Sequence, residues 1–177
     1  FEAFNGLISQ MVAEHESDGT LDHRPMPSGY RPPTDTHLSF PGKVLADGPG
    51  DRLFIADTNH NRIVVTSLDG AVRQVIGSGE EGLTDGSLAE SAFNHPQGMA
   101  LDGETLYVAD TENHAIRLIH ADTGIVTTIA GGRLGGEGDG GPATEAAMDR
   151  PHGCGIDSDG NIFVADSNNH RVRVVGV

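Results

Sequence analysis

The sequence predicts an all-β fold, and three observations lead to this prediction. Glycine supplies 25 of the 177 residues, about twice the average usage of roughly 7%, and glycine permits the positive φ angles of tight turns. One motif occurs three times at a spacing of 55 residues, as PGKVLAD from Pro41, PQGMALD from Pro96 and PHGCGID from Pro151. Within each copy the apolar residues alternate with a period of two, which favours strands.

The middle copy shows the strand pattern of the unit. We expect strands over 98–102, 105–110, 114–120 and 125–130, because turn-forming residues separate these runs. A four-stranded antiparallel meander repeated at tens of residues is typical of a β-propeller blade. The sequence therefore predicts a partial propeller of about three four-stranded blades over 40–177. The expected blades cover 40–77, 95–131 and 150–177, the last one incomplete, with long loops between them.

Residues 1–39 differ in kind from the repeats. An apolar stripe at helical spacing predicts an amphipathic helix over 1–19, with Ser-Asp-Gly at 17–19 as its stop. The stripe consists of Phe1, Phe4, Leu7, Ile8, Met11 and Val12. Prolines at 25, 27, 32 and 33 predict an extended Pro-rich linker over 20–39.

The composition limits the classes of partner. Eleven Lys and Arg against 26 Asp and Glu give a net charge of −15, which disfavours DNA and RNA because their binding depends on cationic side chains. No run approaches the roughly 18 apolar residues of a membrane span, and the start lacks a basic signal-peptide region. We therefore expect no membrane partner, no signal peptide and no transmembrane segment in this chain. The single cysteine, Cys154, leaves the compartment open.

Several motifs could indicate chemistry, but each has a simpler interpretation. Two G-x-G-x-x-G runs, from Gly77 and Gly136, follow meander strands and enclose acidic residues, so we expect connecting loops and no nucleotide site. The run DSDGN at 157–161 lacks the distal glutamate of a calcium loop and predicts a hairpin turn. Cys154 lies in a predicted strand and is expected to be inert packing. We expect no cofactor.

One aspartate per copy, at the same turn, could form a metal or catalytic carboxylate set. These residues are Asp57, Asp110 and Asp166. A carboxylate that accepts backbone N–H groups also stabilises a turn, and the following Thr or Ser can do the same. We favour this structural role, and predict no catalytic or metal-ligating residue.

At this turn the sequence resembles the NHL-repeat family, which is named for an Asn-His-Leu signature. Asn113-His114 and Asn169-His170 match its first two letters, whereas His60-Asn61 in the first copy reverses them. The resemblance implies a propeller, usually of six blades. The order of helix, proline linker and repeats is also similar to proteins that fuse a thioredoxin-like domain to an NHL propeller, in which the helix would end the first domain.

The resemblance also bears on metal binding. Some enzymes of related propeller fold, such as peptidyl-hydroxyglycine lyases, build a metal site from histidines around the central axis. Here blade geometry separates the repeat-matched His114 and His170, so we expect them and their neighbouring asparagines to be turn contacts.

The blade topology predicts where a binding site would lie. In a four-stranded blade the turn after the second strand and the loop that follows the fourth emerge at the same end. This places His95, Gln97, Arg150 and His152 together with the long acidic loops. Because functional residues often lie on loops of a rigid scaffold, we predict a non-catalytic segment that binds a protein or small ligand.

Two alternatives remain open at this stage: a metal-assisted lyase or hydrolase with its site on the central axis, and a redox-linked scaffold of a thioredoxin-like/NHL fusion protein. An open arc of blades would expose apolar sheet faces and a strand edge. We therefore expect that the chain either self-associates or is a fragment of a longer polypeptide.

Overall fold

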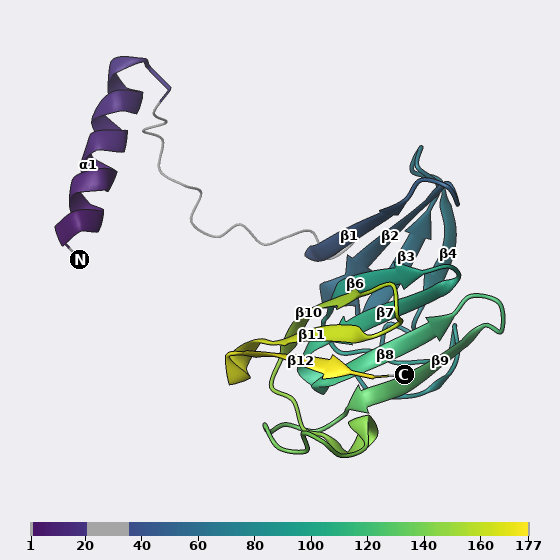
Figure 1. Ribbon diagram of the computed structural model, residues 1–177. Coiled ribbons are helices and arrows are strands. Elements are labelled where there is room, and N and C mark those ends of the chain that lie inside the picture. Colours follow the sequence, from purple (N-terminus) through teal and green to yellow (C-terminus); the bar gives the residue numbers. More distant parts are fainter. Residues whose placement is uncertain (1, 21–35, 177) are drawn as a thin grey trace. The chain divides into compact units, whose positions relative to one another are not determined.

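The chain divides into two compact units, Phe1–Thr36 and His37–Val177. The computed structural model describes the backbone of residues 2–20 and 36–176, and the side chains of residues 9–20 and 36–176 (Figure 1). The first unit contains the expected helix, α1 (Glu2–Ser17). Phe1, the side chains of Phe4, Leu7 and Ile8 in the stripe, and positions 21–35 of the predicted linker lie outside what is described. Among the described residues, no helix combines the length and apolarity needed to cross a membrane.

The second unit consists of three antiparallel sheets, which confirms the all-β partial propeller (Figure 1). The first sheet contains β1 (Pro41–Asp47), β2 (Arg52–Asp57), β3 (Arg62–Thr66) and β4 (Val72–Ile76). The second contains β6 (Pro96–Asp102), β7 (Thr105–Asp110), β8 (Ala115–His120) and β9 (Ile125–Gly131), with the short β5 (Gly86–Ser87) added beyond β9. The third contains β10 (Pro151–Ile156), β11 (Ile162–Asp166) and β12 (Arg171–Val175). We call these sheets blades 1, 2 and 3.

The hydrophobic cores lie between blades. One cluster joins blades 1 and 2 through residues such as Phe54, Ile63 and Val108, and a second joins blades 2 and 3 through residues such as Ile116 and Val164. Each core also includes one buried side chain from the long loop ahead of a blade. These are Phe93, which is 0% exposed, and Met148, which is 1% exposed. The loops are therefore packed parts of the propeller and not free connections.

The first strands of neighbouring blades approach one another closely. β6 lies against both β1 and β10. A Cβ atom built on Gly98 of β6 would stand 2.5 Å from the Cα of Gly153 and 2.6 Å from the carbonyl oxygen of His152. A glycine in a strand often marks such an approach of two backbones. Gly98 is therefore required by the spacing of blades 2 and 3.

We predict that Gly98→Ala separates β6 from β10 and lowers the free energy of unfolding by about 1–3 kcal/mol, the usual cost of overpacking. The matched control is Gly155→Ala in β10, where a Cβ would meet no atom within 4 Å. Urea denaturation of both variants measures the difference. Equal midpoints for the two variants would show that the blades tolerate a wider spacing.

Candidate functional site on the loop face

The turn between the second and third strands has the same construction in all three blades. Each second strand ends at a fully buried aspartate, Asp57, Asp110 or Asp166. A single turn of 3-10 helix follows, and it ends at a left-handed residue, Asn61, His114 or His170, with φ of 50°, 53° or 55°. We call these segments, residues 57–61, 110–114 and 166–170, the Asp turns. Together with the loops 77–95 and 131–150 they form what we call the loop face.

The carboxylate of Asp110 binds three different segments. It accepts the backbone N–H of Asn94 at 2.8 Å, the side-chain amide of Asn113 at 2.8 Å and Nη1 of Arg117 at 2.9 Å. Burial raises the pKa of Asp110, and these three donors oppose the rise. The side chain of Arg117 is itself 0% exposed and stands over the Phe93 ring, 4.9 Å from its centroid. The loop, the turn and strand β8 are thus tied to one buried charge.

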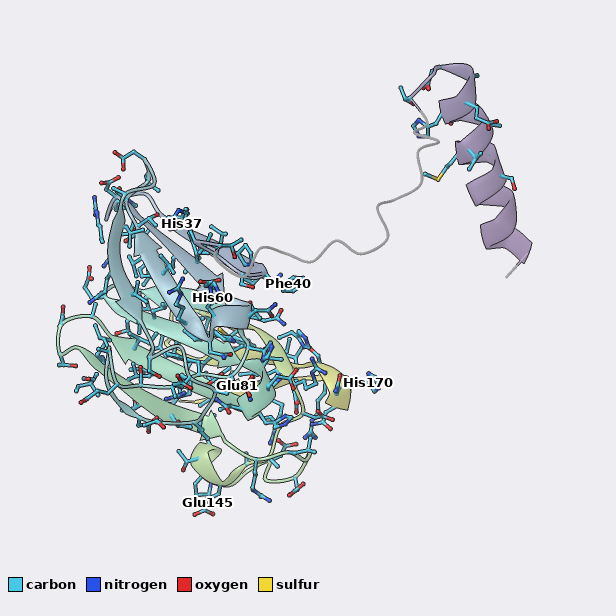
Figure 2. All side chains as sticks on the ribbon, turned by 180° about the vertical axis from the view of Figure 1, so that it is seen from behind. His37, Phe40, His60, Glu81, Glu145 and His170 are labelled. Atoms are coloured by element: carbon cyan, nitrogen blue, oxygen red, sulfur yellow. The ribbon has the colours of Figure 1, made fainter. Side chains whose placement is uncertain are left out.

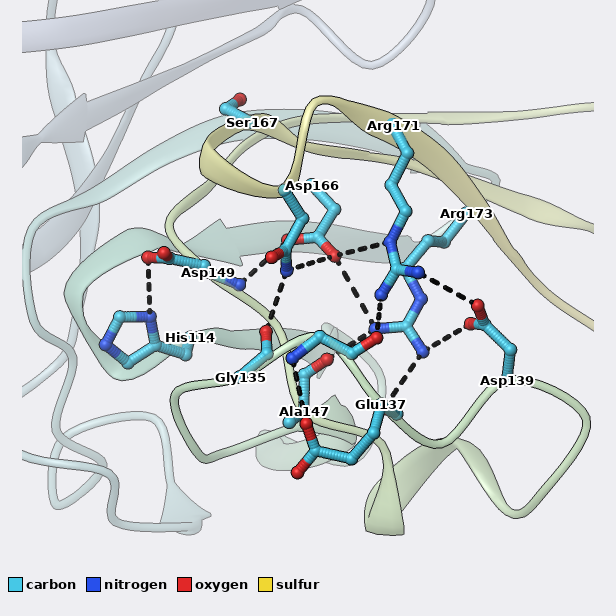
Figure 3. A network of polar contacts seen from close by, with 12 residues as sticks. His114, Gly135, Glu137, Asp139, Ala147, Asp149, Asp166, Ser167, Arg171 and Arg173 are labelled. Atoms are coloured by element: carbon cyan, nitrogen blue, oxygen red, sulfur yellow. Dashed lines mark hydrogen bonds and ion pairs between the residues drawn. The ribbon is translucent and has the colours of Figure 1, made fainter.

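The other two blades repeat this arrangement with different residues. In blade 3 the N–H of Asp149 and the amide of Asn169 donate to Asp166, and Arg171 and Arg173 lie within 3.5 Å of it (Figure 3). In blade 1, Ser39, His60 and Arg62 supply the corresponding donors to Asp57. The aspartates do not cap their own turns, since no side-chain cap bond forms there. Their backbone donor comes from the segment ahead of the blade, which differs from the interpretation based on sequence.

The Asp turns of blades 1 and 2 also bind the start of the next blade. Thr58 donates its hydroxyl to the carbonyl of Pro96 at 2.9 Å, and Thr111 does the same to Pro151 at 2.8 Å. The side chain of the left-handed residue accepts the backbone N–H of the residue directly before that proline. Asn61 accepts from His95 at 3.0 Å, and His114 accepts from Arg150 at 3.1 Å. These contacts join successive blades at the loop face.

The reversed pair His60-Asn61 performs the same two tasks as Asn113-His114. His60 donates Nδ1–H to Asp57 at 2.8 Å, as Asn113 does to Asp110. Asn61 occupies the left-handed position and accepts the next blade's N–H, as His114 does. Asparagine and neutral histidine each offer a donor or an acceptor at similar reach. The apparent departure of the first copy is therefore an exchange of side chains between two equivalent roles.

Of the four predicted ligand-binding residues, two share an unusual backbone position. His95 and Arg150 have φ of 51° and 50°, and each directly precedes the first proline of a blade. The corresponding residue of blade 1 is Phe40, with φ of 50° and 71% of its surface exposed (Figure 2). We call Phe40, His95 and Arg150 the pre-proline residues. Sequence reasoning omitted Phe40, although its place before Pro41 was a usable signal.

The four predicted residues are half-buried. The ring of His152 contacts the carbonyl of Arg150 at 2.8 Å, and the Arg150 guanidinium pairs with Glu112 at 2.5 Å. A Cβ built on Gly42 of blade 1 would stand 3.6 Å from Cγ of Gln97. The ring of His95 contacts the side-chain oxygen of Asn94 at 2.8 Å. Within the described part of the chain, no hydrogen bond joins the Arg150 and His152 pair to His95 or Gln97. The polar contacts of His95 thus lie in blade 2 and its loop, and those of His152 lie in blade 3.

The chemistry available on this face is limited. Exposed Glu80, Glu81 and Glu90 give the loop before blade 2 a negative rim. Across residues 2–20 and 36–176, no three His, Cys, Asp or Glu side chains gather as a metal ion would require. Cys154 lies near the carbonyl oxygens of Gly98 and Tyr107, and burial raises the pKa of its thiol to about 12. Such a thiol is protonated at neutral pH and does not act as a nucleophile.

Comparisons with known proteins agree with the repeat. A family model described as NHL repeat matches residues 93–117 and 148–175, which include two of the Asp turns. The chain belongs to the NHL-repeat family. NHL repeat-containing protein 2 of Gallus gallus is 53% identical over 94 residues, which cover 53% of this chain and 13% of that protein. Protein SUPPRESSOR OF QUENCHING 1, chloroplastic, of Arabidopsis thaliana is 37% identical across 94% of this chain and 17% of its own length.

A solved structure extends the likeness to the fold of the NHL segment. The crystal structure of an auxiliary nutrient binding protein from Bacteroides thetaiotaomicron superposes with a TM-score of 0.64 at 24% identity. The match covers 75% of this chain and 36% of that one. At this identity the likeness shows the propeller fold alone. The chain spans only 13–17% of the length of the curated relatives it matches.

Removal of one buried carboxylate should destabilise its blade. We predict that Asp110→Ala lowers the free energy of unfolding by about 3 kcal/mol, because it leaves the Arg117 charge poorly compensated in the core. Asp122→Ala, at an exposed aspartate of the β8–β9 turn, should change it by about 0.5 kcal/mol or less. Chemical denaturation monitored by circular dichroism compares them. A small effect at Asp110 would mean that Asp85 compensates Arg117 alone.

The exchange of roles at His60 and Asn61 can be tested by restoring the usual order. The double variant His60→Asn/Asn61→His should stay within about 1 kcal/mol of the parent, because both bonds can re-form. Asn61→Ala should lose about 1–3 kcal/mol, since it removes the acceptor for the His95 N–H. Thermal melts of the two variants give the comparison. A double variant as unstable as Asn61→Ala would contradict the equivalence.

Burial should make Cys154 slow to react. With a thiol pKa of about 12, the thiolate fraction at pH 8 should be about a thousandfold lower than in the unfolded chain, where the pKa is about 8.5. Alkylation by iodoacetamide, followed by mass spectrometry, should therefore be slow in native buffer and fast in urea. Similar rates in both conditions would indicate an exposed thiol.

Proposed function

We propose that this NHL segment is a non-catalytic binding or scaffold module that presents its loop face to a protein or a small ligand. The observation that carries the proposal is the set of pre-proline residues. Phe40, His95 and Arg150 hold left-handed φ angles of 50°, 51° and 50° at one point of each blade. Such a conformation costs of order 1–3 kcal/mol and persists only where surrounding contacts determine it, most often at functional sites.

The side chains at these three points differ, although their backbone is the same. Phenylalanine, histidine and arginine follow one another around the face, and neighbouring blades fix two of the backbone N–H groups, those of His95 and Arg150. The backbone position is thus set by the fold while the side chain is free to vary. A rigid frame that carries variable side chains suits recognition of a partner.

The charge distribution supports a polar or cationic partner. The rim of Glu80, Glu81 and Glu90 and the net charge of −15 favour cationic groups and disfavour nucleic acids. The Bacteroides protein with the same fold is described as nutrient-binding, which fits a binding role for this propeller type. The metal-assisted lyase or hydrolase would need converging imidazoles, and no three His, Cys, Asp or Glu side chains gather in the described parts of the chain.

The proposal can be tested with peptides selected from a displayed random library on the immobilised chain. Binding of the selected peptides is then measured against two variants that each carry four alanine substitutions. The loop-face variant changes His95, Gln97, Arg150 and His152, and the control changes the exposed Asp122, Thr123, Ser158 and Asp159 at the opposite end of the sheets.

We expect the loop-face variant to lose at least tenfold in affinity, with Phe40→Ala causing a further loss, whereas the control keeps its affinity. Both variants should keep nearly the melting temperature of the parent, because surface polar substitutions typically change stability by about 0.5 kcal/mol or less. Peptides that bind both variants equally would place the binding surface elsewhere. Unfolding of the loop-face variant would assign the four residues a structural role.

A further inference from the structure

Two hydrogen bonds hold the pre-proline residues of blades 2 and 3, and they use different acceptors. The side-chain oxygen of Asn61 accepts the N–H of His95 at 3.0 Å, and Nδ1 of His114 accepts the N–H of Arg150 at 3.1 Å. A backbone N–H can only donate, so Nδ1 must be unprotonated and the His114 ring neutral. The contact between blades 2 and 3 therefore depends on a proton, whereas the amide of Asn61 does not titrate.

The backbone of His114 is fixed on both sides of the ring. Its N–H donates to the carbonyl of Thr111 at 3.2 Å, and its carbonyl accepts the N–H of Gly132 at 3.0 Å. The side chain is 19% exposed, so solvent reaches it. A change in protonation is therefore answered by movement of the ring and not of the turn.

A second partner for the ring stands beside the first. Oδ1 of Asp149 lies 3.9 Å from Nδ1 of His114 (Figure 3). The amide of Asn168 donates to the same oxygen at 3.1 Å, and the backbone N–H of Asp149 donates to Asp166 at 2.8 Å, so blade 3 holds the carboxylate in place. A charged N–H···O bond is about 2.7–2.9 Å long, and the ring has to move by about 1 Å to form one.

The contact between blades 1 and 2 contains neither titratable group. Position 94, directly before His95, is asparagine where the next blade has Asp149, and position 61 is asparagine where blade 2 has His114. A histidine and an acid thus occur together at one contact, and two amides occur at the other. An ion pair can form only at the first of these, which suits a histidine that changes its partner on protonation.

The remaining charges around the ring are already paired. Glu112, on the same Asp turn, binds the guanidinium of Arg150 at 2.5 Å. Asp110, at the end of β7, binds Arg117 of β8 at 2.9 Å. In the parts of the chain that the structure describes, no Lys or Arg side chain forms an ion pair with Asp149. Its carboxylate is therefore available to an imidazolium.

Neighbouring histidines differ from His114 in what they contact. Nδ1 of His95 contacts the side-chain oxygen of Asn94 at 2.8 Å, and Nδ1 of His152 contacts the carbonyl oxygen of Arg150 at 2.8 Å. An imidazolium donates from both nitrogens, so these two contacts survive protonation. At His114 the bonded nitrogen has to change from acceptor to donor. Acidification thus breaks the bond to the Arg150 N–H and leaves the other two contacts.

We propose that His114 and Asp149 form a pH-sensitive switch at the contact between blades 2 and 3. The neutral ring accepts the N–H of Arg150, and the protonated ring turns to donate Nδ1–H to Asp149. Histidine changes its charge between about pH 5 and 8, so the exchange takes place on mild acidification. Arg150 then loses a contact that holds its left-handed φ of 50°, a conformation that persists only where surrounding contacts determine it.

The switch acts on the loop face through Arg150. Blade 2 keeps its pre-proline residue in place, because Asn61 holds His95 in acid and at neutral pH alike, whereas blade 3 releases its own. A partner that contacts both residues therefore binds more weakly in acid. This consequence rests on the proposed function, but the exchange of hydrogen bonds does not.

The exchange can be followed by NMR on the ¹⁵N-labelled full chain between about pH 8 and about pH 5. The amide proton of Arg150 should move upfield as the ring is protonated. Its protection from hydrogen exchange, corrected for the intrinsic pH dependence, should fall at least about tenfold. The amide of His95 is the internal control and should keep its protection. This comparison needs no variant, so it does not depend on the folding of a substituted chain.

Two substitutions install residues that the contact between blades 1 and 2 already uses. His114→Asn should hold the Arg150 N–H over the whole range of pH, as Asn61 holds that of His95. Asp149→Asn should move the transition of the Arg150 amide to lower pH, because the imidazolium loses its carboxylate partner. The matched control is Asp159→Asn, an exposed aspartate in the β10–β11 turn, which should leave the transition where it is.

Three results would overturn the switch. They are constant protection of the Arg150 amide across the range, a transition that persists in His114→Asn, and a transition that Asp149→Asn leaves at the same pH. A transition that is lost in the first variant and shifted in the second supports it.

The effect on the loop face is measured separately, as the affinity of the library-selected peptides at neutral pH and in mild acid. We expect the parent to lose at least about fivefold in acid, and His114→Asn to keep its affinity. Equal affinities of the parent in both conditions would contradict control of the loop face. Failure to select any peptide contradicts the proposed function alone, since the amide of Arg150 reports the switch without a ligand.

Discussion

The buried aspartate at the end of each second strand is the interaction on which the propeller segment depends. A fully buried carboxylate is tolerated only when cationic and hydrogen-bonding partners surround it. Asp110 therefore fixes the loop through Asn94, the turn through Asn113 and strand β8 through Arg117. The buried aspartate requires a guanidinium partner, but the arginine need not occupy the same position of the third strand in every blade. Arg62, at the first residue of β3, meets it in blade 1.

The limits of the strands were predictable to within two residues. Alternation of apolar residues with a period of two identifies each strand, and turn-forming residues delimit it at both ends. The middle copy was expected to begin strands at 98, 105, 114 and 125, and β6, β7, β8 and β9 begin at 96, 105, 115 and 125. β5 was missed, since two residues carry no periodicity and only its pairing with β9 defines it. The roles of Arg117 and Arg173 were missed because arginine in a strand usually indicates a solvent-facing position.

The candidate site was predictable in its location but not in its parts. Blade topology correctly put the Asp turns and the long loops at one end, whereas the pairing of Arg150 with Glu112 depends on side-chain reach that sequence spacing does not give. Asn61 and His114 hold the start of the next blade, whereas Asn113 and Asn169 bind the aspartate and the loop of their own blade. At His95 and Arg150 the contacts from Asn61 and His114 use the backbone N–H and not the side chain.

The hydrogen bonds between successive blades follow the order of the chain. Thr58 and Asn61 hold residues 96 and 95, and Thr111 and His114 hold residues 151 and 150, so every contact runs from an earlier repeat to a later one. Each spans a similar length of chain, and the entropy of closing it is nearly the same at each step. A chain made from its N-terminus thus presents a finished template before the next blade is synthesised. Every repeat contains both an Asp turn that can bind the next blade and a first strand that the previous blade can bind. Duplication of a repeat can therefore change the number of blades without a new kind of contact between them.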